Sequence, residues 1–282
     1  MATPLKPDSY CVDTGPVPLL VDFLMDKGAK GLFVGGTTGE GIILEASERK
    51  RLHEAALSAV NGRVPVLLHV GALRTDTAVD LARHAAALGA DAIAAVTPYF
   101  YGIIDDGLAA YYQAIAEAVP DMPLYGYEIP HMAVNGIGPD LAFRLCQSIP
   151  SMAGLKTSNP SIQAVRRLVD AVPEDRIVLS GNETAALGAL SLGVDGLISG
   201  LSTAVPEPFV ALTQAFSSGE ADEALRQQRV INRLLAQIPA GMRLAAIKSV
   251  LAARGVPVGT PVPALPQIDA EIWPAMRTIL SR

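Results

Sequence analysis

The sequence has little cysteine, no long apolar run and no excess of positive charge, and each shortage excludes a class of protein. Cys11 and Cys146 are the only cysteines, and neither lies in a C-x-x-C or Cys/His pattern that would bind a metal. No apolar run approaches the ~20 residues of a membrane helix, and the start MATPLKPDSY lacks the pattern of a signal peptide. We therefore expect two reduced thiols, no membrane partner and a cytoplasmic location.

The charge balance is acidic, with 22 basic and 28 acidic side chains among 282 residues and a net charge of -6. The broad positive field of a nucleic-acid binder is missing, so nucleic acid is excluded as a partner. Hydrophobic residues make up 50 % of the chain, enough to bury a large core. The expected partners are small molecules or further copies of the chain.

Short apolar runs alternate with helical patterns along most of the sequence. The runs are apolar throughout, which is typical of parallel strands covered on both faces. Strands are expected at 31–34, 64–70, 92–96, 124–127, 152–156, 177–180 and 196–199, with a broken one at 2–5. Helices are expected near 15–28, 46–60, 75–88, 107–118, 138–147, 161–171, 184–193 and 206–217. Eight such units predict an α/β fold, a (β/α)₈ TIM barrel.

The tail of the chain has a different pattern. Helices are expected near 221–236, 241–253 and 269–280, interrupted by a proline-rich stretch from Pro257 to Pro266. No linker precedes the tail. We expect residues 1–220 to form the barrel and residues 221–282 to form a C-terminal helical extension packed on it, within one structural domain.

The stretch Gly31–Glu40, GLFVGGTTGE, reads as a strand that ends in an anion-binding turn. Glycines at 35, 36 and 39 are expected to adopt positive φ, leaving the amides of Thr37 and Thr38 to face a ligand. The two hydroxyls add donors that suit a carboxylate, whereas the lysine of a phosphate-binding P-loop is absent. An ordinary glycine-rich turn is the structural alternative.

Lys156 ends the apolar run that starts at Met152, so its amine is expected to face the interior of the barrel at the carboxyl ends of the strands. Desolvation disfavours the charged form of a lysine, and addition to a carbonyl carbon needs the neutral amine. A solvent-facing amine is the structural alternative. A Schiff-base mechanism also needs a proton shuttle and a carboxylate site, for which Tyr127 and the Thr37–Thr38 turn are candidates.

Several motifs together resemble the dihydrodipicolinate synthase/N-acetylneuraminate lyase family. They are GGTTGE at 35–40, TPY at 97–99, YEIP at 127–130, GLK at 154–156 and SGNE at 180–183, with AIK at 246–248 and PVG at 257–259 in the tail. The resemblance covers the whole chain. It implies a (β/α)₈ barrel with a C-terminal helical extension, a homotetramer built as a dimer of dimers, and pyruvate or a longer 2-keto acid as substrate. It implies neither a metal nor an organic cofactor.

The resemblance also assigns roles to individual residues. Lys156 matches the Schiff-base lysine, and Tyr127 matches the tyrosine that transfers protons to and from the aldol oxygen. Thr37 and Thr38, with Gly36 beside them, match the pair that binds the substrate carboxylate.

Three positions depart from the synthase pattern. Phe100 replaces a second tyrosine of a hydroxyl relay that crosses the subunit interface, so the relay is cut unless Tyr99 or Tyr101 substitutes. Met132, in Pro130-His131-Met132, replaces an arginine that binds the carboxylate of aspartate semialdehyde. Glu128 replaces an asparagine, with no consequence that the sequence reveals.

The missing arginine argues against dihydrodipicolinate synthase. It leaves aldolases or dehydratases of 2-keto-3-deoxy sugar acids, sialic-acid-type lyases and aromatic hydratase-aldolases, and we expect a lyase or aldolase of a 2-keto-3-deoxy sugar acid or related 2-keto acid. Ser158, Asn182, Glu183 and Ser202 are then candidates to contact a hydroxylated tail. For Asn182 and Glu183 the alternative is helix capping. His131, in the loop near the mouth of the barrel, is a further candidate substrate contact, and its alternative is a solvated surface position. Dihydrodipicolinate synthase and a non-catalytic keto-acid-binding member of the family remain the alternative functions.

Overall fold

The computed structural model describes residues 1–268 and 271–281. Contacts between residues divide the chain into two compact units. Unit 1 combines Met1–Val64 with Ser199–Arg282, and unit 2 is the continuous segment Pro65–Ile198. Both units contain helices and strands, and the two alternate along unit 2, which confirms the predicted α/β class.

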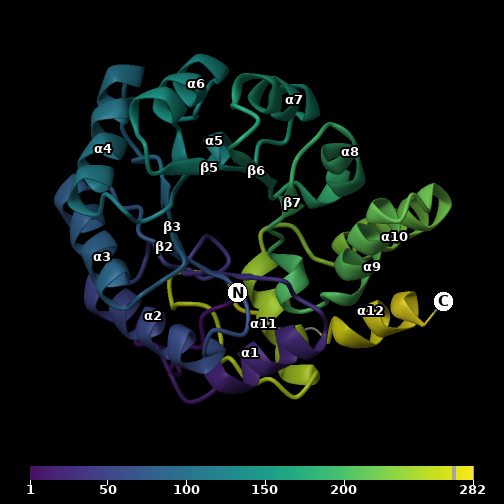
Figure 1. Ribbon diagram of the computed structural model, residues 1–282. Coiled ribbons are helices and arrows are strands. Elements are labelled where there is room, and N and C mark those ends of the chain that lie inside the picture. Colours follow the sequence, from purple (N-terminus) through teal and green to yellow (C-terminus); the bar gives the residue numbers. More distant parts are fainter. Residues whose placement is uncertain (269–270, 282) are drawn as a thin grey trace. The chain divides into compact units, whose positions relative to one another are not determined.

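Unit 2 contains six parallel strands, each paired with the next one along the chain. The strands are β2 (Val66–His69), β3 (Ala92–Val96), β4 (Leu124–Glu128), β5 (Met152–Thr157), β6 (Ile177–Ser180) and β7 (Gly196–Leu197). The helices are α3 (Thr75–Ala87), α4 (Asp105–Ala118), α5 (Pro130–Ala133), α6 (Pro139–Ser148), α7 (Ile162–Ala171) and α8 (Ala186–Ser191), with the 3₁₀ turn η1 (Glu183–Ala185). Helices α4, α6, α7 and α8 lie outside the strands (Figure 1).

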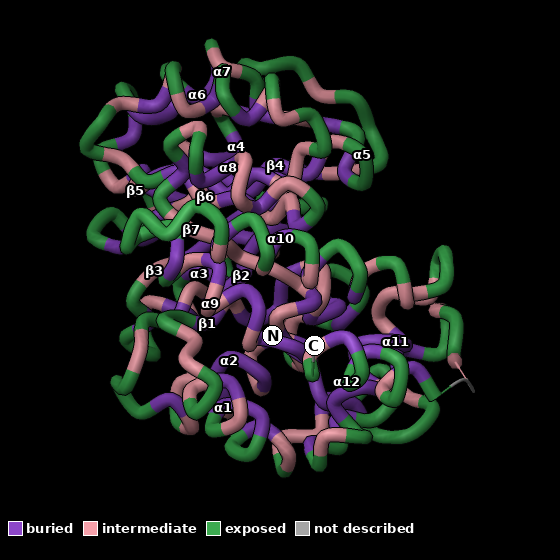
Figure 2. The backbone as a smooth tube through the Cα atoms, turned by 90° about the vertical axis from the view of Figure 1, so that its right-hand side faces the viewer, coloured by how far each residue is buried: buried purple, intermediate pink, exposed green. Residues whose placement is uncertain are grey.

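The central strands of unit 2 are buried on both faces. In β3 the last four of five residues are buried, and in β5 all but Ala153 are. The tube at β4 is accordingly mostly purple in Figure 2. A strand covered on both sides does not alternate between apolar and polar residues. The unbroken apolar runs of the sequence therefore located these strands correctly.

Unit 1 carries one strand and most of the later helices. Its elements are β1 (Leu32–Val34), α1 (Val17–Asp26), α2 (Ala46–Val60), the 3₁₀ turn η2 (Leu201–Thr203), α9 (Glu207–Ser217), α10 (Ala221–Leu235), α11 (Arg243–Ala253) and α12 (Trp273–Leu280). Helix α1 packs on α2, and α10 packs on both α9 and α12. Arg254 donates to the carbonyl of Ala204 and to Glu207, and its guanidinium lies 4.9 Å from the centre of the Trp273 ring. This arginine therefore links α9 to α12.

Two expected elements differ in the structure. Residues 2–5 form no strand, because only Leu5 makes a bridge, an antiparallel one with Val12. Pro4 has no amide hydrogen to donate to a ladder, which explains the loss of the predicted eighth strand. Residues 269–270, part of a predicted helix, lie outside the described residues, and α12 begins at Trp273.

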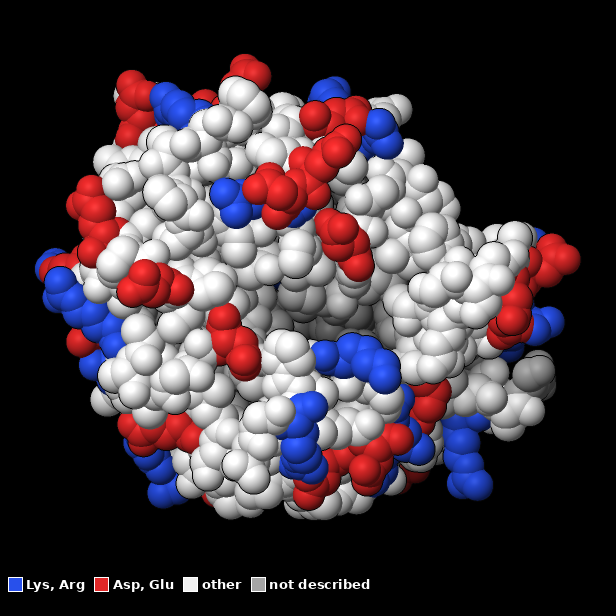
Figure 3. Space-filling view, in the orientation of Figure 1, with Lys and Arg blue, Asp and Glu red and all other residues white. Residues whose placement is uncertain are grey.

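The charge distribution on the surface and the lengths of the helices bear on the predicted partners. On the face shown in Figure 3, basic and acidic side chains are interspersed among uncharged ones. Among the described residues, no helix combines the length and the apolar character that crossing a membrane would require.

Candidate active site

Tyr127 and Lys156 lie side by side in unit 2 because their strands are neighbours. Strands β4 and β5 are parallel, and their register pairs Tyr127 with Lys156 and Glu128 with Thr157. Both side chains are buried, with 2 % of Tyr127 and 4 % of Lys156 exposed. A buried phenol and a buried amine thus occupy neighbouring positions on β4 and β5.

The amine of Lys156 contacts the ring of Tyr127 and the hydroxyl of Ser158. Its Nζ lies 3.7 Å from the centre of the Tyr127 ring and donates a hydrogen bond of 2.9 Å to Ser158 Oγ. The hydroxyl holds the amine at a fixed place, while the face of the Tyr127 ring shields it from water. An amine fixed and partly desolvated in this way is suited to covalent chemistry on a carbonyl carbon.

Gly181, which follows β6, packs closely against the lysine and its hydroxyl partner. A Cβ at Gly181 would overlap Ser158 Oγ and stand 3.2 Å from Lys156 Nζ. The backbone after β6 therefore approaches these two side chains as closely as a residue without a side chain allows. A larger residue at position 181 would displace Ser158 from the amine.

Glu128, whose role the sequence left open, forms a buried network at the carboxyl ends of β4 and β5. Thr157 Oγ1 donates to Glu128 Oε2, and Asn159 Nδ2 donates to Glu128 Oε1 over 2.9 Å. The backbone amide of Ser158 donates to the carbonyl of Glu128 over 2.8 Å. Burial raises the pKa of the Glu128 carboxyl, and the two side-chain hydrogen bonds oppose that shift. Glu128 thereby fixes the segment that carries Lys156 and Ser158.

His69, at the end of β2, is a neighbour of the site that the sequence analysis did not single out. Its ring meets that of Tyr127 edge to face, with 5.9 Å between the ring centres, and Nε2 accepts from the amide of Val96. Its position at the carboxyl end of a strand could have drawn attention to it, because the same criterion identified Tyr127 and Lys156.

Asn182 and Glu183 follow β6 in unit 2. Asn182 makes no side-chain cap at η1, and its amide instead donates to the carbonyls of Asn159 and Pro160. The capping interpretation of Asn182 is therefore wrong, since this amide joins the loops after β5 and β6. Glu183 is buried. His131 lies within the short helix α5 rather than in a loop, with an exposed side chain.

The remaining predicted residues, Gly36, Thr37, Thr38 and Ser202, belong to unit 1. Thr37 and Thr38 lie in the turn after β1, and both are partly exposed. The amide of Glu40 donates to the carbonyl of Thr37 over 3.0 Å, which closes this threonine turn. Ser202 donates its hydroxyl to the carbonyl of Ser199 over 2.8 Å.

The glycines of the threonine turn act differently from expectation. Gly35 has the predicted positive φ, at 71°, but Gly36 and Gly39 do not. A Cβ at Gly36 would run into the ring of Phe33, and one at Gly39 would lie 3.0 Å from the backbone of Gly35. These two glycines are thus required for close packing and not for a left-handed backbone.

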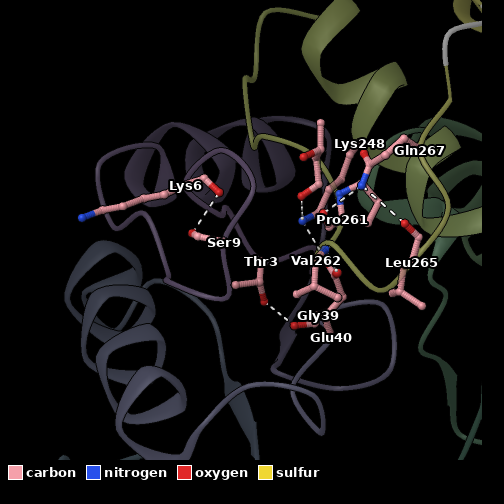
Figure 4. A network of polar contacts seen from close by, with 11 residues as sticks. Thr3, Lys6, Ser9, Gly39, Glu40, Lys248, Pro261, Val262, Leu265 and Gln267 are labelled. Atoms are coloured by element: carbon pink, nitrogen blue, oxygen red, sulfur yellow. Dashed lines mark hydrogen bonds and ion pairs between the residues drawn. The ribbon is translucent and has the colours of Figure 1, made fainter.

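Glu40 has the left-handed conformation instead, with φ of 57°. Its carboxylate is fully buried, accepts from the amide of Val262 over 2.8 Å and pairs with Lys248 Nζ over 2.6 Å. Lys248 also donates to the carbonyl of Thr260 over 2.8 Å. Figure 4 shows these groups pointing toward one another, with Thr3 reaching the carbonyl of Gly39 nearby. The pair therefore ties the threonine turn to α11 and to the 260–262 segment.

Lys248→Met should lower the free energy of unfolding by about 3 to 5 kcal/mol, because the buried carboxylate of Glu40 would lose its cationic partner. The double variant Lys248→Met with Glu40→Leu should be less destabilised than the two single changes together. Urea unfolding followed by circular dichroism measures all four proteins. Strict additivity would show that the pair contributes no coupling.

The comparisons with known proteins agree with this fold. The model of the Dihydrodipicolinate synthetase family matches residues 1–282, and the chain belongs to that family. A probable 2-dehydro-3-deoxy-D-pentonate aldolase of Escherichia coli is 35 % identical over 224 residues, 78 % of this chain and 73 % of the relative. The 4-hydroxy-tetrahydrodipicolinate synthase of Bacillus subtilis is 30 % identical over 250 residues, 88 % of this chain and 86 % of the relative.

Two solved structures are similar over nearly the whole chain. The sialic acid aldolase of Ruminococcus gnavus has a TM-score of 0.94 at 27 % identity, covering 99 % of this chain and 94 % of that one. A prophage protein of Escherichia coli K12, solved in complex with pyruvate, has a TM-score of 0.91 at 27 % identity, covering 99 % and 95 %. The family to which the chain belongs thus includes synthases, lyases and aldolases.

Proposed function

We propose that the chain is a pyruvate-dependent class I lyase or aldolase that acts on a 2-keto-3-deoxy sugar acid or a related 2-keto acid. The observation that carries the proposal is the buried amine of Lys156, fixed by Ser158 against the ring of Tyr127. The relatives support it. The aldolase of Ruminococcus gnavus has a catalytic lysine, since a structure of its catalytic lysine mutant also matches, and the Escherichia coli prophage protein binds pyruvate.

The chemistry begins with the neutral amine of Lys156. Nζ adds to the C2 carbonyl of the 2-keto acid, and loss of water leaves an iminium ion. Tyr127 gives its phenol proton to the departing hydroxyl, which leaves as that water. The resulting phenolate takes the proton of the C4 hydroxyl, the C3–C4 bond breaks, an aldehyde leaves, and the electron pair moves into an enamine. Protonation at C3 and hydrolysis then release pyruvate and the free lysine. The iminium itself accepts the electrons, so these steps require neither a metal nor an organic cofactor.

The other site residues bind substrate in this proposal. Thr37 and Thr38, with the backbone at Gly36, hold the C1 carboxylate. The hydroxylated tail is contacted by side chains at the strand ends, namely Ser158, Asn182, Glu183 and Ser202. Because its hydroxyl already binds the amine, Ser158 is close to the carbon that forms the imine.

We further propose that residues 1–220 form a TIM barrel and residues 221–282 a helical extension packed on it. The high TM-scores to family structures support the barrel. The proposed working form is a cytoplasmic homotetramer, and the free thiols of Cys11 and Cys146 fit a reducing compartment.

Dihydrodipicolinate synthase is the second candidate function, which the similarity to the Bacillus subtilis enzyme favours. Met132 argues against it, since an arginine is expected there in the synthase. A second carboxylate that binds without a paired cation lacks a charge-assisted contact and is desolvated, which costs several kcal/mol.

The two candidates predict opposite substrate preferences. We expect cleavage of a 2-keto-3-deoxy sugar acid to pyruvate, with kcat/KM for the condensation of pyruvate with aspartate semialdehyde lower by at least about 10²-fold. A coupled assay for pyruvate formation and a second assay for the condensation compare the two directly. Efficient condensation would favour the synthase and leave the Schiff-base mechanism intact.

A further inference from the structure

Arg243, the first residue of α11, lies beside the threonine turn within unit 1. The contact is made through Gly200, which precedes η2. A Cβ at Gly200 would overlap Thr38 Oγ1 and would stand 3.4 Å from Arg243 Nη2. The hydroxyl of Thr38 and a guanidinium nitrogen of Arg243 therefore lie on the same side of Gly200, where a residue with a side chain would collide with them.

The buried ion pair explains why α11 presents its first residue there. Lys248 lies on α11 and pairs with Glu40, which directly follows the threonine turn (Figure 4). The pair fixes α11 against the segment that contains Thr38, and Arg243 begins the same helix. The guanidinium is only partly buried, as are Thr37 and Thr38, so a small ligand has access to all three.

The chemistry of these donors selects a carboxylate. A guanidinium is a permanent cation whose donors match the two oxygens of a carboxylate, and a threonine hydroxyl donates one further hydrogen bond. The Thr38 hydroxyl and Arg243 Nη2 both lie near the same side of Gly200 and so within about 6 Å of each other. The two oxygens of a single carboxylate can therefore accept one hydrogen bond from each. No sequence motif indicated this cation.

We propose that Arg243, together with Thr38, binds the C1 carboxylate of the 2-keto acid substrate. The proposal rests on the function proposed above and adds a specificity-determining residue to it. Arg243 makes the site favour a keto acid with a free carboxylate over a neutral keto ester of nearly the same shape.

Trapping of the imine measures this preference. The wild-type chain, Arg243→Met and Arg243→Lys are incubated with increasing pyruvate or methyl pyruvate and then with borohydride, and the adduct is quantified by intact mass. For Arg243→Met, we expect the pyruvate concentration for half-maximal adduct to rise by about 10- to 100-fold, the size of a lost charge-assisted hydrogen bond. The methyl pyruvate concentration for half-maximal adduct should change by less than about 3-fold. For pyruvate, the value of Arg243→Lys should lie between those of the wild type and Arg243→Met.

A matched control is Arg233→Met, which removes an exposed arginine from α10 and should match the wild type. An unchanged pyruvate response in Arg243→Met would overturn the proposal. So would an equal loss for pyruvate and methyl pyruvate, because that pattern indicates a structural role. An effect seen only with a keto acid that carries a second carboxylate would also overturn it. Absence of any adduct in the wild-type chain would refute the Schiff-base function as well, which distinguishes the two failures.

Discussion

Lys156→Ala should abolish the adduct that pyruvate and borohydride form with the wild-type chain, and it should lower kcat by at least about 10⁴-fold. The reason is that Lys156 supplies the buried amine that lies against the ring of Tyr127 and that forms the imine in the proposed mechanism. In the wild type we expect one reduced pyruvyl group per chain, and peptide mapping should locate it on Lys156. Intact mass before and after reduction, with an assay of pyruvate release, measures both effects.

A lysine far from the chemistry provides the control for this experiment. Lys30 is exposed, and Lys30→Ala should form the adduct and turn over like the wild type. Labelling of Lys156→Ala at saturating pyruvate would show that a different lysine forms the imine. A wild-type chain that binds pyruvate without any covalent adduct would instead fit a non-catalytic binding protein.

Tyr127→Phe should still form the imine, but its kcat should fall by about 10²- to 10⁴-fold, the usual range for a general acid or base. The phenylalanine keeps the ring that packs on Lys156 and His69, so the fold and the position of the amine should be preserved. Only the hydroxyl that takes the C4 proton is lost. Borohydride trapping and steady-state kinetics on the same preparation separate the two steps.

Tyr125, two residues earlier on β4, offers a matched control, because Tyr125→Phe removes a phenol from the same strand. We expect its kcat to stay within about 3-fold of the wild-type value, since no proton transfer depends on it. If Tyr127→Phe retained full turnover, the proton transfer would have to be reassigned to Tyr99, Tyr101 or a water molecule.

The sequence alone determined the order of the elements and the two residues on which the proposed chemistry depends. Strands β3 and β6 have the predicted bounds, because a parallel strand buried on both faces leaves an unbroken apolar run that ends at a turn. The same rule drew attention to Tyr127 and Lys156, each at the end of such a run. The predicted strand at 2–5 does not form, because an apolar run does not show whether a neighbouring strand pairs with it.

Only the tertiary structure decided what surrounds these residues. The ring of Tyr127 against Lys156 Nζ, the hydrogen bonds from Thr157 and Asn159 to Glu128, and the buried pair of Glu40 with Lys248 join residues that are 29 to 208 positions apart along the chain. The proximity of Arg243 to Thr38 is another contact between residues far apart in the sequence. Such contacts depend on side-chain direction and on packing between distant elements, whereas the periodicity of a sequence reports only whether each element is buried.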